Sequence, residues 1–352
     1  MPNPEMIVLA RLSRGVSQAE LATALNVSQG LISKVEHGNQ SASEPLLADI
    51  ARHLRYPISF FFRHERVQGT DSICFHHRKR ASMPAKLLST IEAQMHIAQL
   101  NVKSLLEDLE IEATNRFVTL DPGEYDDDPK VVAQELRRIW RLSNGPISNL
   151  VHVIEAAGGV VVYRDFGTKT LDGMSCWARG CPPLFFINSL IPMDRARFTI
   201  AHELGHLVMH ATPPEYHPET QANAFALELL APIAEIGYDL RDLRMAKLPT
   251  LKAHWRLSMN ALVMAAGTTG ALPDKRVKSL FVQMSRTGYR TNEPYPLSRE
   301  DPTLLDKALD VHTRQHGYSY DELAAMAGLL PDEFVDLYTS SSDDQPRLRV
   351  LS

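Results

Sequence analysis

The chain has 352 residues, of which 44% are hydrophobic and 22% charged, and its formal net charge at pH 7 is −5. This is an ordinary globular composition, and the length favours two or three domains over one. The acidic balance argues against a chain that coats nucleic acid non-specifically, although a small DNA-reading segment can still be attached to an acidic body.

Compartment is indicated by what the sequence lacks. No apolar run approaches the roughly 20 residues needed to span a bilayer, and the N-terminus lacks a basic-then-apolar signal pattern. The cysteines, Cys74, Cys176 and Cys181, form neither an even framework nor a C-x-x-C pair, so they fit a reducing compartment. We therefore expect a cytoplasmic protein with no membrane partner.

The stretch "SQAELATALNVSQGLISKVEHG" predicts two short helices joined by a turn. Ser17 and Ser28 are suitable N-caps for helices over 18–25 and 29–37, and Gly38 is suited to end the second. The shared core is expected to consist of Ala22, Leu25, Val27, Ile32 and Val35.

The start of the second helix is the part that enters the major groove in helix-turn-helix proteins. The residues expected to face DNA are Gln18, Ser28, Gln29, Gly30, Ser33 and Lys34. Gln29 is the candidate base reader, because a glutamine amide can pair with adenine, while Gln18 and Lys34 are better suited to phosphates. Residues 1–63 carry six Lys/Arg and five Asp/Glu, so a helical protein-interaction module with the same core stays open.

A basic linker, "HERVQGTDSICFHHRKR", precedes a long helix expected over residues 85–110. Apolar residues spaced three and four apart form a heptad seam along it: Leu88, Ile91, Met95, Ala98, Val102, Leu105 and Leu109. Such a seam needs a partner. We favour a second copy, and hence a homodimer, over a face of the chain's own body.

The Pro-, Gly- and Asp-rich segment 121–130 marks a domain boundary. After it we expect a helix ended by Gly158 and Gly159, then short β-runs "VVVYR", "GMSCWA" and "LFFIN", then mostly helices from Pro192. Near the C-terminus, residues 319–338 weakly repeat the pattern of 17–36, but the second helix begins with Pro331-Asp332-Glu333, so it predicts packing rather than DNA reading. The segment "LKAHWRLSMNALVMAA" has a similar rhythm and no basic face.

The stretch "RFTIAHELGHLVMH" contains an H-E-x-x-H motif. His202 and His206 share one face of a helix and can bind one zinc ion, while Glu203 can address a water molecule as general base. Glu219 is the candidate third ligand on a following helix, with Glu228 as its competitor. His210 could support the site from outside the ligand set, and His217 could stabilise an oxyanion.

These motifs carry two resemblances. "SQAELATALNVSQGLISKVEHG" is similar to the Xre (Cro/C1-type) helix-turn-helix family, and "RFTIAHELGHLVMH…ETQANAFALELLAP" resembles the ImmA/IrrE metallopeptidase family. The second resemblance implies a gluzincin-like site with His202, His206 and Glu219 as metal ligands and Glu203 as general base. It also implies a substrate class, because family members cleave Xre-type repressors.

The combined expectation is an α+β protein, mainly helical with a small β-sheet. Its segments are a helix-turn-helix domain over 1–63, a linker and long helix over 64–130, a zincin-like metallopeptidase domain over 131–285 and a helical region over 286–352. We expect a transcriptional regulator that binds operator DNA and hydrolyses a peptide bond in a repressor-type protein with Zn²⁺. The alternatives are a non-catalytic zinc or ligand sensor and, from another class, a toxin-antitoxin partner that acts by binding.

Overall fold

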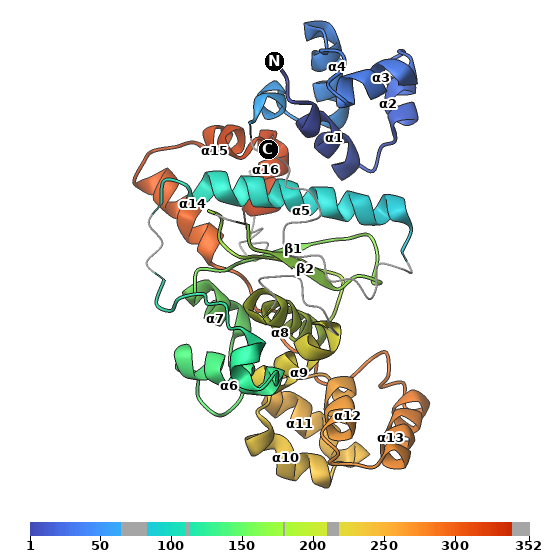
Figure 1. Ribbon diagram of the computed structural model, residues 1–352, viewed down its shortest axis with the longest axis vertical. Helices are drawn as coiled ribbons and strands as arrows, with labels where there is room; N and C mark the ends of the chain where they lie inside the picture. The colour runs from blue at the N-terminus through green and yellow to red at the C-terminus, as the bar shows by residue number, and fades with distance from the viewer. Residues whose placement is uncertain (65–82, 110–112, 179, 210–217, 340–352) are drawn as a thin grey trace, which may run out of the picture. The chain divides into compact units, whose positions relative to one another are not determined.

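The computed structural model describes residues 1–64, 83–109, 113–178, 180–209 and 218–339. Within these ranges the chain forms two compact units, shown in Figure 1. Unit 1 contains the described parts of 1–69, 83–110 and 303–352, and unit 2 contains those of 111–302. Helices dominate and one three-stranded sheet is present, so the predicted α+β class is confirmed.

Unit 1 is all helical. Its N-terminal elements are α1 (Pro4–Ser13), α2 (Gln18–Ala24), α3 (Gln29–Glu36), α4 (Glu44–Leu54) and the short helix η1 (Ile58–Phe62). The remaining elements are α5 (Ala85–Leu106), α14 (Leu304–Arg314), α15 (Tyr320–Ala327) and α16 (Pro331–Tyr338). The C-terminal helices thus share one unit with the N-terminal ones.

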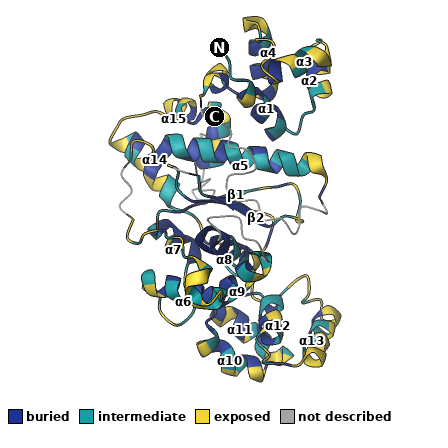
Figure 2. Cartoon of the chain, in the orientation of Figure 1, coloured by how far each residue is buried: buried dark blue, intermediate teal, exposed yellow. Residues whose placement is uncertain are grey.

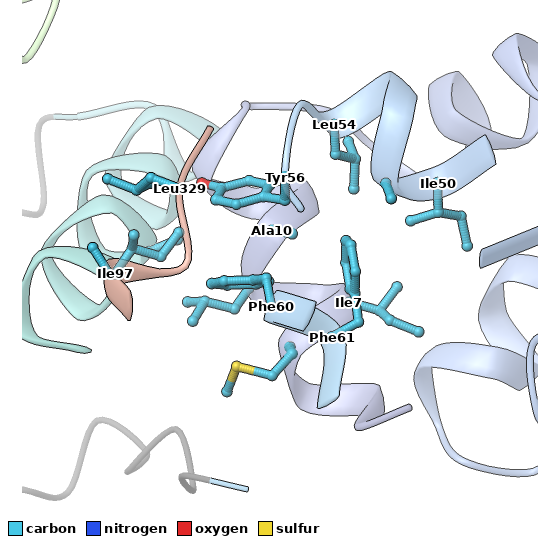
Figure 3. Packing of buried hydrophobic residues seen from close by; sticks show 14 of the residues in the cluster. Ile7, Ala10, Ile50, Leu54, Tyr56, Phe60, Phe61, Ile97 and Leu329 are labelled. Carbon is cyan, nitrogen blue, oxygen red and sulfur yellow. The ribbon is translucent and has the colours of Figure 1, made fainter. Parts of the chain in front are cut away.

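One hydrophobic core joins these segments (Figure 3). Tyr56 stacks on Phe60 with ring centroids 4.5 Å apart. Ile97 of α5 and Leu329 of the α15–α16 turn belong to the same cluster. Burial of such side chains contributes about 1.5–3 kcal/mol each, so the C-terminal segment stabilises the helix-turn-helix part directly.

The heptad-patterned helix forms as α5, but its seam is not a free surface. Five of the seven seam positions are buried: Ile91, Met95, Ala98, Val102 and Leu105. Leu105 lies in the core of unit 1, where α5 packs on α1, α14 and α15. The part of the seam around Leu105 is therefore covered within unit 1, and the predicted homodimer stays a prediction.

The C-terminal repeat has the predicted packing role. Ser319 caps α15 through a capping box with Glu322, as Ser17 caps α2. On α16, Glu333 forms an ion pair of 2.7 Å with Arg14, and Phe334 is fully buried in the core. The acidic start of this helix is thus used to bind the N-terminal helices.

Unit 2 holds the sheet and the remaining helices. In chain order, its first elements are η3 (Pro122–Tyr125), α6 (Pro129–Ile139), α7 (Leu150–Ala156) and β1 (Val160–Arg164). They are followed by β2 (Gly173–Cys176), β3 (Leu184–Asn188), α8 (Met193–Met209) and α9 (Pro218–Leu230). The last elements are α10 (Ile233–Arg241), η4 (Met245–Lys247), α11 (Leu248–Trp255), α12 (Met259–Thr268) and α13 (Asp274–Arg286).

The sheet has the order β1-β3-β2, and its strands are the three predicted β-runs. β1 pairs with β3 in parallel, with Val160 opposite Leu184, and β2 pairs with β3 antiparallel, with Ser175 opposite Phe185. β2 is therefore an edge strand, and it lies against α8. This arrangement places the strand beside the H-E-x-x-H motif.

The segment 121–130 lies inside unit 2. Its acidic residues act as caps, since Asp121 accepts from Gly123 N and Asp128 accepts from Lys130 N, both at 2.9 Å. Just before it, Leu120 N donates to Val208 O of α8 at 2.8 Å. The Pro-, Gly- and Asp-rich composition therefore belongs to a tight loop that is bonded to the unit. Among the described helices, none is both long and apolar enough to cross a membrane.

Candidate metal centre and DNA-reading helix

The H-E-x-x-H motif lies within α8, which places His202 and His206 one turn apart on the same face. Their Nε2 atoms are 3.1 Å apart. Glu219, in the first turn of α9, brings Oε2 to 3.6 Å from His202 Nε2 and Oε1 to 3.4 Å from His206 Nε2. The ligand atoms of this triad all lie within 4.8 Å of one another.

These separations fit a small divalent cation. Zinc binds nitrogen and oxygen donors at about 2.0–2.2 Å, so donors at tetrahedral angles lie roughly 3.3–3.5 Å apart. The observed donor distances, 3.1, 3.6 and 3.4 Å, are close to that range. Glu219 Oε1 is buried and has no hydrogen-bond partner among the described residues, as expected of an atom placed to bind a cation.

The charges within the triad support the same view. The rings of His202 and His206, which face the Glu219 carboxyl, lower its pKa below the ordinary value. Burial alone would lower the pKa of His202, but the bond to Glu219 and the nearby charge of Glu203 outweigh it, and the pKa is raised. The carboxylates of Glu203 and Glu219 therefore favour positive charge at His202, and a bound cation would supply positive charge there.

Close packing of α8 on α9 brings the ligands together, and Gly205 permits it. A Cβ atom at this position would lie 2.9 Å from Phe225 Cδ1 and 3.4 Å from Ala222 Cα of α9. The first distance is shorter than real Cβ contacts, so any larger residue would push the two helices apart. Gly205 thus allows the close approach of α8 and α9.

Two supporting side chains were not anticipated from the sequence. Asn223 Oδ1 lies 3.0 Å from His202 Nδ1, which holds that ring with Nε2 directed to the triad. Ser175 Oγ, on the edge strand β2, donates to Glu203 Oε2 at 2.8 Å. Ser175 is 1% exposed, so it fixes the carboxylate that the motif offers to a water molecule.

Glu228, the alternative third ligand, is engaged elsewhere. It accepts from Gln134 Nε2 at 2.8 Å and from Ile233 N at 3.1 Å, and it is buried. It therefore ties α6 and the start of α10 to α9. His210 and His217 lie outside the described residues.

The helix-turn-helix part has the predicted geometry. Ser28 caps α3 by accepting from Leu31 N at 3.2 Å, and the turn passes through Asn26 with φ of 54°. Ala22, Ile32 and Val35 are buried. Of the candidate DNA-facing residues, Ser28, Gln29, Gly30 and Lys34 are exposed, and Gln18 and Ser33 are partly exposed. The start of α3 thus presents a polar, accessible surface.

A relay of hydrogen bonds holds Gln29 at this surface. Arg11 forms a buried ion pair with Glu36, with Nε to Oε1 at 2.6 Å. Glu36 Oε2 accepts from Gln18 Nε2 at 2.7 Å, and Gln18 Oε1 accepts from Gln29 Nε2 at 2.8 Å. A carboxylate only accepts, so Glu36 orients the Gln18 amide, which in turn leaves Gln29 Oε1 outward and one N–H free. That is the donor and acceptor pair that adenine requires.

The two other helix pairs with a helix-turn-helix-like pattern are α11–α12 and α15–α16. In both, carboxylates lie at the start of the second helix. On α12, Glu293 accepts from Met259 N at 2.7 Å and from Asn260 N at 3.1 Å. On α16, Asp332 and Glu333 occupy the first turn. A carboxylate at a helix start repels phosphate, so among these three described pairs α3 alone keeps a start suited to DNA.

Comparison with known protein families matches two segments. Residues 7–61 match a model described as "Helix-turn-helix", and residues 154–266 match a peptidase-family model described as "IrrE N-terminal-like domain". The second match contains α8 and α9 with all three residues of the triad. Neither the curated proteins nor the solved structures gave a match. The chain is therefore a fusion of an Xre-type helix-turn-helix segment with an IrrE N-terminal-like domain of the ImmA/IrrE metallopeptidase type.

Proposed function

We propose that the protein is a DNA-binding transcriptional regulator whose ImmA/IrrE-type domain is a zinc metallo-endopeptidase that cleaves a repressor-type protein. The observation that carries this proposal is the convergence of His202, His206 and Glu219, with Ser175 holding Glu203 beside them. A sensor needs only the metal-binding triad. A fixed carboxylate next to it is what hydrolysis requires.

In this proposal His202, His206 and Glu219 hold zinc, and Asn223 fixes the His202 ring. When bound, zinc lowers the pKa of a water molecule and polarises the scissile carbonyl. Glu203 accepts the proton of the attacking water and transfers it to the leaving amine, while Ser175 keeps the carboxylate aimed at that water. The edge strand β2 borders the site, where an extended substrate segment could pair with it.

For DNA binding, Gln29 is proposed to contact a base, and Gln18 and Lys34 to contact phosphates at the ends of α2 and α3. Ser28, Gly30 and Ser33 complete the surface that enters the groove. A single helix-turn-helix contacts few base pairs, so we propose that operator binding uses a homodimer.

The peptidase part is tested by co-expression with helix-turn-helix repressors encoded beside the gene, followed by mass spectrometry of the products. The wild-type chain should yield one defined cleavage, and Glu203→Gln should abolish cleavage while keeping one zinc per chain. Absence of cleavage together with unchanged gene regulation in Glu203→Gln would instead establish the sensor.

The ligand set is tested by metal analysis of purified variants. Glu219→Ala and His202→Ala should each lose zinc. Glu228→Gln is the matched control, because it removes a buried carboxylate from the same helix, and it should keep zinc although it loses stability. Retention of zinc by Glu219→Ala would remove Glu219 from the ligand set.

A further inference from the structure

A strongly basic surface lies on α13, outside both sites described above. Residues 274–290 contain five Lys/Arg and one Asp, in a chain whose net charge is −5. The cations are Lys275, Arg276, Lys278, Arg286 and Arg290, and all five are exposed. Figure 2 shows that much of α13 has the colour of exposed residues. This local excess of positive charge contrasts with the acidic balance of the whole chain.

The helix that carries these cations is held firmly from its other side. Leu280 and Met284 are buried, and α13 packs on α12. Gly267 of α12 allows the close approach of Val277, whose Cγ2 would lie 3.2 Å from a Cβ at that glycine. The side chains are thus presented by a rigid helix rather than by a loop.

The cations form a stripe along the exposed face. At 100° per residue, Lys275, Lys278 and Arg286 fall within an arc of about 80°, and the eleven steps from first to last span about 16 Å. Arg276 lies about 80° beyond this arc, so the four cations together cover about 160° of the helix. A straight row of cations of this length can contact several successive phosphates of one DNA strand.

These charges are not neutralised within the protein. Over the ranges that the structure describes, the side chains of Lys275, Arg276, Lys278 and Arg286 form no ion pair or hydrogen bond. Other exposed cations of unit 2 do have partners, for example Arg244 and Lys247, which share Asp242. Unpaired cations in a row repel one another, so an anionic partner bound to this helix face would stabilise it.

We propose that the exposed face of α13 binds the phosphate backbone of double-stranded DNA, as a second contact in addition to α3. This rests on the proposed DNA-binding function. Duplex DNA carries one negative charge per about 1.7 Å of its axis, which a stripe of cations complements. The contact would carry no sequence information, because the phosphates are the same along any duplex. It would also supply phosphate contacts that residues 1–63 lack, with six Lys/Arg against five Asp/Glu.

The test measures binding of the full-length protein to a fluorescent duplex, selected from a random pool, at several salt concentrations. The α13 variant carries Lys275→Gln, Arg276→Gln, Lys278→Gln and Arg286→Gln. Each lost phosphate contact lowers the slope of log affinity against log salt by about 0.9, so the slope should fall by about 2–4 and affinity at low salt by about 10- to 100-fold.

The matched control removes four other exposed cations of unit 2, through Gln substitutions of Arg138, Lys169, Arg241 and Arg244. It should bind nearly as the wild type does. An unchanged slope in the α13 variant, an equal loss in the control, or tighter binding of single-stranded RNA than of duplex would overturn the proposal. A wild type that binds no duplex at all would overturn the proposed DNA-binding function itself.

Discussion

Ser175 Oγ donates a hydrogen bond of 2.8 Å to Oε2 of Glu203, so the edge strand β2 holds the carboxylate of the H-E-x-x-H motif. This bond joins positions 28 residues apart in the sequence. It fixes the orientation of the carboxylate that we propose as general base. Hydrogen bonds to charged groups contribute about 1.5–3 kcal/mol, enough to matter for the orientation of a general base.

We expect Ser175→Ala to lower kcat for the cleaved repressor about tenfold or more, with little change in KM and full zinc content. The reason is that substrate and metal contacts remain while Glu203 loses its fixed position. Ser175→Thr keeps the hydroxyl and should restore most of the activity. A parallel loss of zinc, or no recovery in Ser175→Thr, would show that Ser175 only supports the packing of β2.

Gly205 gives a second prediction, because the usual effect of alanine in a helix should be reversed there. Gly→Ala inside a helix normally stabilises by about 0.5–1 kcal/mol. At Gly205 the new Cβ would lie 2.9 Å from Phe225 Cδ1, so α8 and α9 must separate. We expect Gly205→Ala to lower both the melting temperature and the zinc affinity.

Gly237 is the matched control for this change. It lies inside α10, and a Cβ there would meet only Ile233, at 3.8 Å, which is ordinary contact. Gly237→Ala should therefore raise the melting temperature slightly and leave zinc binding unchanged. Equal effects of the two substitutions would mean that Gly205 has no special role in the approach of the helices.

The packing of α5 gives a third prediction. Leu105 is fully buried in the core of unit 1. Leu105→Ala should therefore cost about 2–5 kcal/mol of unfolding free energy without altering the oligomeric state of the folded protein. Sedimentation velocity and thermal unfolding of the same sample separate the two effects.

Leu88 provides the comparison, since it belongs to the same seam but is only partly buried. Leu88→Ala should cost clearly less stability. If both substitutions instead released monomers from a dimer with little loss of melting temperature, the seam would be an interface after all.

Features set by neighbouring residues could be predicted from the sequence. The caps at Ser17 and Ser28, the turn at Asn26 and the pairing of His202 with His206 depend on separations of a few residues, and all are present. The three strands were also placed correctly, because short β-rich runs were separated by turn residues.

Features that depend on contacts between distant segments could not be predicted. A heptad pattern shows that one face of α5 is buried, but it does not show what covers that face. Ser175 and Glu36 are ordinary residues whose partners are revealed only by the fold. The sequence analysis did not single out the basic face of α13, because the helix-turn-helix-like pattern "LKAHWRLSMNALVMAA" ends before that helix begins.

The relay from Glu36 to Gln29 gives the last prediction. Gln18 accepts from Gln29 because its own amide donates to Glu36. If this orients the base reader, Gln18→Met should relax specificity at the base that Gln29 contacts and weaken binding to the selected operator about tenfold. Gln29→Met should relax the same position, because both changes remove one recognition element.

The two substitutions should therefore be non-additive. Adding Gln18→Met to Gln29→Met should cause no further loss of discrimination between base pairs at that position. The reason is that Gln18 acts on specificity only by orienting the Gln29 side chain, which is then absent. A double-mutant cycle on the operator and on duplexes changed at single positions measures this coupling. Lys34→Met serves as the control, because a phosphate contact should weaken all duplexes alike and add fully to either change. A phosphate contact of Gln18 would weaken all duplexes alike, so the decisive quantity is the discrimination between base pairs. Additive losses of discrimination for Gln18 and Gln29 would mean that the relay does not set specificity.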